Sequence, residues 1–105
     1  MFELKDGEMW ILELPSRMLT EMGGTPGYLK ISNMRVVFVP GGMSVSKRAA
    51  EIPLRAISNV YLTTNLLIIP CSFRINTDSG MSYKFTTWRR NEAVAAINRQ
   101  RQRLA

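Results

Sequence analysis

The chain has 105 residues, 46% of them apolar, and its 14 basic and 8 acidic residues give a net charge of +6. This length fits one domain with a core of its own, and the apolar content is too high for a disordered chain. Cys71 is the only cysteine, which excludes an internal disulfide and favours a reducing compartment. No apolar run reaches the ~20 residues that span a bilayer, and the acidic N-terminus does not resemble a signal peptide. We expect a single cytoplasmic domain over residues 1–105, with peripheral membrane attachment left open.

Apolar and polar residues alternate along most of the chain, which predicts six or seven short strands. The apolar positions that mark them are, in chain order, Met9 to Leu14, Leu29 and Ile31, Val36 and Phe38, Ile52 and Leu54, Ile57 to Leu62, Phe73 and Ile75, and Met81 to Phe85. Residues 16–27 follow Pro15 and are expected to form a loop or the frayed second half of the first strand. Residues 43–48 predict a mobile loop, and residues 77–80 predict a hairpin turn.

The apolar pattern changes to a helical period near the C-terminus. Apolar residues recur every three or four positions, which predicts one amphipathic helix within about residues 88–104. Thr87 or Asn91 is expected to cap its start. Its small residues suit it to close the open end of a bent sheet, and Ile97 is expected to dock there. The expected neighbours of Ile97 are Val36, Phe38 and Phe85.

The tryptophans and several methionines could serve either the core or a surface. Large aromatic side chains are mostly buried, so Trp10 and Trp88 are expected to pack in the core. Met18, Met22 and Met43 fall in expected loops, where they either form an adaptable patch for a partner or fill gaps in the packing.

The residue types that catalysis needs are mostly missing. The sequence contains no histidine, so neither a histidine base nor a Cys-His pair is available. The glycine-rich stretch from Gly23 to Gly27 lacks the Lys-Ser/Thr pair of a phosphate loop. We therefore expect no enzymatic activity, no cofactor and no metal.

Positive charge is concentrated after residue 21. The first 21 residues hold five of the 8 acidic residues and two bases, so twelve of the 14 bases lie in the rest of the chain. A basic surface favours anionic partners such as lipid headgroups, nucleic acid or acidic proteins, although solvated charge without a partner is the plain alternative. The aromatic signature of the common RNA-binding sheets is absent, so nucleic acid is disfavoured.

Three blocks of the sequence, taken in order, resemble the GRAM family, a branch of the pleckstrin-homology-like superfamily. The stretch GYLKISNMRVVF, residues 27–38, is similar to a signature of glycine, aliphatic strand, Ser/Thr-Asn turn, arginine and phenylalanine. The segment EIPLRAI, residues 51–57, resembles the second block. Residues 73–85 and the helix after them resemble the closing hairpin and capping helix. The similarity covers residues 8–103.

The resemblance implies a mainly β fold: a PH-like, partly open seven-stranded barrel of two packed antiparallel sheets, capped by one C-terminal α-helix. It also implies that Arg35 sits at the turn-proximal end of the second strand of a hairpin. Family members are binding modules, some for phosphoinositides or other anionic lipids and some for proteins. The fold does not decide between these partners.

The resemblance to lipid-binding relatives also indicates candidate site residues. Lipid contacts in such sites come from the loop between strands one and two and the loop between strands three and four. The matching lipid-binding residues in this chain are Arg17, Lys30, Lys47 and Arg48. Ser32 stands where the common phosphoinositide pattern has a second base, so diffuse attraction to an anionic surface is expected, rather than tight binding of one headgroup.

A second basic cluster, Arg99, Arg101 and Arg103, is expected on a solvated helix surface, where it suits the negative end of the helix dipole. An acidic protein partner for this cluster is the alternative.

The leading expectation for the whole chain is a non-catalytic adaptor module that attaches to anionic membrane lipid or to a protein partner. The alternative is a protein–protein or self-association module with no lipid role, and homo-oligomers are left open.

Overall fold

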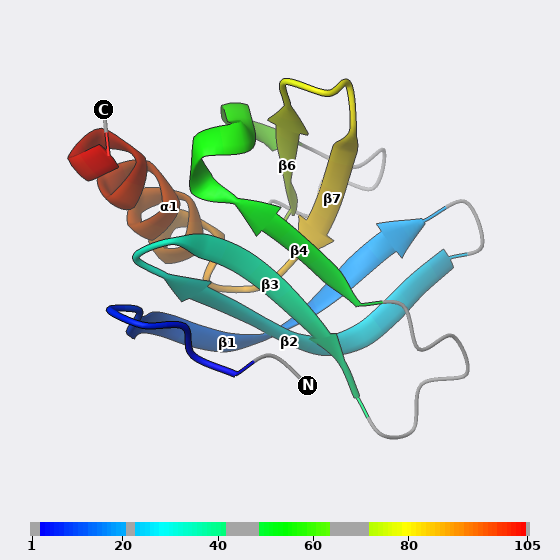
Figure 1. The fold of residues 1–105 in the computed structure, drawn as a ribbon. Coiled ribbons are helices and arrows are strands. Elements are labelled where there is room, and N and C mark those ends of the chain that lie inside the picture. Colours follow the sequence, from blue (N-terminus) through cyan, green and yellow to red (C-terminus); the bar gives the residue numbers. More distant parts are fainter. Residues whose placement is uncertain (1–2, 21–22, 42–48, 64–71, 105) are drawn as a thin grey trace.

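The computed structural model describes residues 3–20, 23–41, 49–63 and 72–104. These residues form seven strands, one short 3-10 helix and one α-helix (Figure 1). In chain order the elements are β1 (Trp10–Thr20), β2 (Gly23–Ser32), β3 (Arg35–Pro40), β4 (Ala50–Pro53), η1 (Leu54–Ala56), β5 (Ile57–Thr63), β6 (Ser72–Thr77), β7 (Ser82–Thr86) and α1 (Arg90–Leu104).

The strands form one antiparallel sheet in the order β4-β3-β2-β1-β7-β6-β5. The predicted class, a mainly β fold of seven strands with one C-terminal helix, is confirmed, and the strands form one continuous sheet in place of the two packed sheets that were expected. The two halves of the sheet are continuous because β1 pairs with β2 along its length and with β7 through Arg17–Leu19. The sheet is not closed into a barrel, since β4 and β5 remain its two edges.

Two alternatives were expected for residues 16–27, a loop or the second half of the first strand, and for residues 16–20 the structure supports the strand. β1 continues to Thr20, and β2 begins at Gly23. β7 pairs with β1 only from Arg17 onward. Because β7 makes no hydrogen bond at Pro15, the missing N–H of the proline is tolerated inside the strand. Met18, expected in a loop, is 5% exposed in the core, while Met22 and Met43 lie outside the described residues.

Gly27 allows β2 and β3 to pack closely. A β-carbon at this position would lie 2.2 Å from the Val39 carbonyl oxygen and 2.8 Å from the Phe38 ring. No larger residue fits this contact without moving the backbone, which gives a physical reason for the glycine that opens the block of residues 27–38.

The core lies between the curved sheet and α1. Phe85 is central to it, with ring centroids 6.0 Å from Phe38 and 5.6 Å from Phe73. Ile97 of α1 is fully buried in the same cluster, which also contains Val36. The helix therefore closes the core as predicted, within nearly the predicted boundaries.

The junction between β7 and α1 corrects the prediction for Trp88. Thr87 is buried and its hydroxyl accepts a hydrogen bond from the Arg89 N–H at 3.3 Å, in the turn that leads into α1. Asn91, also expected as a cap, lies inside the helix. Trp88 is 86% exposed, so its predicted burial is wrong. The alternation that places Phe85 and Thr87 toward the core directs residue 88 outward.

Candidate functional site

The N-terminal segment, residues 3–9, is held against the sheet by a buried ion pair. The Glu8 carboxylate accepts two hydrogen bonds from the Arg35 guanidinium, at 2.9 and 3.0 Å, and one from the Ser32 hydroxyl at 2.6 Å. Arg35 also donates to the Glu3 carbonyl at 2.7 Å and to Glu51 at 3.0 Å. Arg35 thus joins the N-terminal segment to β3 and β4, and it is 4% exposed.

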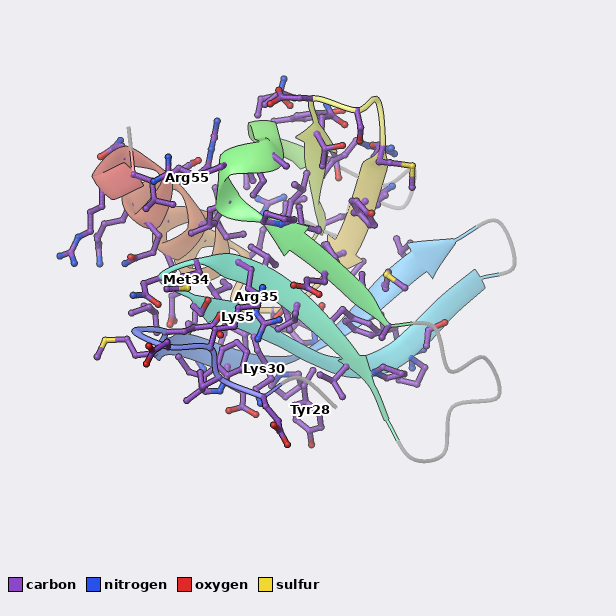
Figure 2. All side chains as sticks on the ribbon, in the orientation of Figure 1. Lys5, Tyr28, Lys30, Met34, Arg35 and Arg55 are labelled. Atoms are coloured by element: carbon purple, nitrogen blue, oxygen red, sulfur yellow. The ribbon has the colours of Figure 1, made fainter. Side chains whose placement is uncertain are left out.

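Asn33 adds a second attachment for the same segment. Its side-chain oxygen accepts from the Met9 N–H at 2.9 Å, and its side-chain nitrogen donates to the Gly7 carbonyl at 3.0 Å. Lys5 lies beside Arg35, and both contact the Glu51 carboxylate (Figure 2). The Ser32-Asn33 turn and Arg35 of the resemblance block therefore serve an internal structural contact in this chain.

The electrostatics of this pair favour its charged form. Burial opposes ionisation of Glu8, but hydrogen bonds from Arg35 and Ser32 outweigh it and lower the pKa of the carboxyl from 4.5 to about 2. The hydrogen bond to Glu8 raises the pKa of Arg35 above its usual range. Because the guanidinium is saturated and buried, Arg35 has little capacity for an external ligand.

Lys30, one of the four predicted lipid-binding residues, lies within the second half of β2 and not in the loop between β1 and β2, where it was expected. It pairs across the sheet with Glu13 of β1 and Val37 of β3. Its amino group is 3.8 Å from the Glu13 carboxylate and 4.5 Å from the centre of the Trp10 ring. Trp10 is half-buried on this outer surface, so its predicted position in the core is wrong. The charge of Lys30 is already balanced within the fold.

Arg17 lies on the same outward surface as Lys30 but is not brought next to it. In the β1–β2 register Arg17 is opposite Pro26, and Lys30 is four residues further along β2. Arg17 is exposed, near the end of β1. Lys47 and Arg48 lie outside the described residues. The structure therefore places two of the four predicted residues, and it separates them.

Two arginines of α1 have structural partners that the sequence did not indicate. Arg101 donates to the carbonyls of Ile57 and Ser58 at 3.3 and 3.1 Å, and Arg90 donates to the Thr63 carbonyl at 3.0 Å. The helix is thus hydrogen-bonded to both ends of β5, an edge strand of the sheet. The expectation that Arg101 lies on a solvated surface is wrong, whereas Arg99 and Arg103 are exposed as expected.

A groove of about 530 Å³ lies between η1 and the C-terminal half of α1. Leu54, Ile57 and Leu104 line it together with polar residues, and Arg55 stands beside the helix (Figure 2). Among the described residues, no group of three His, Cys, Asp or Glu side chains is arranged to bind a metal. The described part of the chain also contains no helix that is long and apolar enough to cross a membrane.

Comparison with solved structures identifies the fold as that of pleckstrin-homology (PH) domains. The N-terminal PH domain of Vps36 superposes with a TM-score of 0.76 at 10% identity, covering 97% of this chain and 85% of that one. The Slm1 PH domain in complex with inositol 4-phosphate gives a TM-score of 0.61 at 8% identity, with 89% and 94% covered. The C-terminal domain of an unknown protein from Leishmania infantum gives 0.80 at 15% identity, with 92% and 87% covered. No family model and no curated protein matches the sequence.

Proposed function

We propose that the chain is a non-catalytic binding module that attaches to anionic membrane lipid. The observation that supports this most is the PH-domain fold, since one similar structure, the Slm1 PH domain, is a complex with inositol 4-phosphate. The net charge of +6 is consistent with an anionic partner. Identities of 8–15% to these neighbours support a likeness of fold, so the lipid itself must be identified by experiment.

The proposed site includes Arg17, Lys47 and Arg48, with Lys30 in a supporting position. β1 ends and β2 begins on the side of the molecule away from α1, and so do the end of β3 and the start of β4 (Figure 1). Lys47 and Arg48 belong to the connection between β3 and β4, so this end would receive their charge. Each base near an anionic surface contributes about 1 kcal/mol, which favours weak and salt-sensitive attachment.

We further propose that residues 1–105 form one domain of GRAM type that works in the cytoplasm, attached peripherally to a membrane. The block of residues 27–38 supports the GRAM assignment, because its glycine, Asn33 and Arg35 each have a defined structural use in this fold.

A protein partner is the second candidate, and the groove between η1 and α1 favours it. The groove combines apolar side chains with Arg55, which suits an apolar residue next to an acidic one. Self-association through the same surface belongs to this alternative. Sedimentation equilibrium over a range of protein concentrations measures it directly, because a self-associating module shows a rising mass.

Vesicle sedimentation tests the lipid proposal. The protein should bind vesicles of phosphatidylcholine with phosphatidylserine at low salt and dissociate as salt is raised, and it should ignore pure phosphatidylcholine. Replacing both Lys47 and Arg48 with Glu should abolish most binding at nearly unchanged melting temperature. The matched control, Arg99→Glu with Arg103→Glu, should have a much smaller effect. Wild-type protein that ignores anionic vesicles at low salt would disprove lipid recruitment.

A further inference from the structure

Two basic side chains lie directly opposite each other on the outer surface of the β6–β7 hairpin. The register pairs Arg74 of β6 with Lys84 of β7. Both alternate with core residues, since Phe73 and Phe85 are fully buried, so both point away from the core. Like charges in directly opposed positions destabilise a sheet. An anion that binds to both would remove this repulsion.

A third cation extends the pair onto the neighbouring strand. Lys84 pairs with Leu19 of β1, and Arg17, two residues before Leu19, pairs with Thr86 of β7. Diagonal neighbours of this kind are about 7–8 Å apart, within reach of long side chains. The other described residues at outward positions of the β1–β7, β7–β6 and β6–β5 registers are uncharged: Leu19, Asn59, Tyr61, Thr63, Ser72, Asn76, Ser82 and Thr86. The acidic residue on the outward surface of β1, Glu13, lies beyond the β1–β7 register and pairs with Lys30.

The arginine of this group is oriented by a row of polar side chains. Arg74 donates to the Ser82 hydroxyl at 2.8 Å, and that hydroxyl donates to the side-chain oxygen of Asn76 at 2.8 Å. The Asn76 side-chain nitrogen in turn donates to Asn59 at 2.9 Å. A guanidinium has five N–H donors, so one bond to Ser82 orients Arg74 and leaves donors for a ligand.

Exposed aromatic side chains accompany these cations. Trp88 follows the end of β7 by two residues and is 86% exposed, and Tyr61 of β5 is 44% exposed. Tryptophan and tyrosine are enriched at membrane–water interfaces, where the ring lies among headgroups. A tryptophan this exposed contributes little to the core, which leaves a surface role.

We propose that the outer surface of β1, β7 and β6, defined by Arg17, Arg74, Lys84 and Trp88, lies flat against an anionic membrane. The inference rests on the proposed lipid function and extends the contact from the ends of the strands to the outside of the sheet. Other basic residues are less suited to this role, because Lys30, Arg35 and Arg101 are engaged within the fold. Charge and the adjacent tryptophan together fit a lipid surface.

A single substitution separates binding from stability. Lys84→Glu replaces a repulsive cross-strand pair with an attractive one, so the melting temperature should stay the same or rise. Affinity for phosphatidylcholine–phosphatidylserine vesicles should nevertheless fall about 25-fold, because two units of charge are lost at roughly fivefold each. Lys84→Gln should lower it about fivefold. A stabilised variant with weaker binding cannot be explained by misfolding.

Three comparisons show which proposal fails. Arg99→Glu, a matched change on α1, should retain most of the vesicle affinity. If wild-type protein binds vesicles, the Lys47 and Arg48 double variant does not, and Lys84→Glu binds like wild type, this surface is wrong and the lipid function stands. If wild-type protein binds no anionic vesicles, both proposals fail.

Tryptophan fluorescence gives an independent readout of the same contact. Emission should shift to shorter wavelength when vesicles are added, because Trp88 leaves water for the headgroup region. The shift should disappear in Trp88→Phe, which keeps Trp10 as an internal reference. Vesicle binding with no change in emission would show that Trp88 stays in water and would overturn its place in this surface.

Discussion

At the scale of single residues, Arg35 has a structural role outside the hydrophobic core. It binds Glu8, Glu51 and the Glu3 carbonyl at once, so one side chain connects the N-terminal segment with two strands. Removing one partner of such a pair leaves a buried charge that is only partly compensated. The same arrangement makes the stability of the protein depend on pH.

The pKa of Glu8 predicts an acid transition. Its folded-state pKa is about 2, below the ordinary 4.5, so its stabilising contribution is complete above about pH 4.5 and is lost as pH falls toward 2. Thermal unfolding of wild type and Glu8→Gln across this range measures the effect. Wild type should lose stability steeply as pH drops, and the variant should be less stable at neutral pH with a flatter profile.

A matched substitution at Glu51 provides the control for the Glu8 experiment. The Glu51 side chain is 38% exposed, so Glu51→Gln leaves a carboxylate on Arg35 and should cost much less. Equal losses from the two variants would show that the Glu8 contact is not the dominant one.

At the scale of elements, α1 closes the open side of the sheet by two kinds of contact. Ile97 is fully buried in the main core cluster, and Arg90 and Arg101 bind carbonyl groups at the two ends of β5. These bonds cover part of a strand edge that would otherwise be free to pair with another chain. The helix therefore stabilises the core and protects the sheet edge together.

Ile97→Ala tests the contribution of the helix to the core. Removing a fully buried isoleucine side chain to the β-carbon should cost on the order of 2 to 4 kcal/mol of unfolding free energy. Chemical denaturation measures the change, with the exposed Arg99→Ala as a control near zero. A loss under about 0.5 kcal/mol for Ile97→Ala would show that α1 does not close the core.

At the scale of the whole molecule, continuity of the sheet through β1 makes the two halves interdependent. β1 pairs with β2 on one side and with β7 on the other, so neither half is complete without it. The core cluster likewise takes residues from both halves and from α1. A fold built in this way has no internal boundary at which one part could unfold alone.

The whole chain should therefore unfold in one step. Urea transitions followed by far-UV circular dichroism and by tryptophan fluorescence should coincide, as expected for a small two-state domain. Trp10 packs beside Lys30 and Arg35, so its emission reports on the region that anchors the N-terminal segment. An earlier fluorescence transition would show that this region detaches first and would contradict a single cooperative domain.

The sequence by itself determined the class of fold and the position of the helix. Period-two alternation and the helical period are local properties, which is why the strands at Phe73 and Phe85 and the helix with Ile97 were predicted correctly. Pro15 was misleading because its effect depends on whether a neighbouring strand needs its N–H, which is a property of pairing. The prediction for Trp88 was wrong because large aromatic side chains are mostly buried, whereas Trp88 follows the inward-facing Thr87 and therefore points outward.

Only the tertiary structure decided which basic residues have partners inside the fold. Arg35 and Arg101 have the same charge as Arg17, but the contacts that occupy them join segments 27 and 44 residues apart. The opposition of Arg74 and Lys84 depends on the register of β6 and β7. A sequence gives the order of the charges and folding sets the distances between them, so the composition favoured an anionic partner, while cross-strand pairing determined which cations lie side by side.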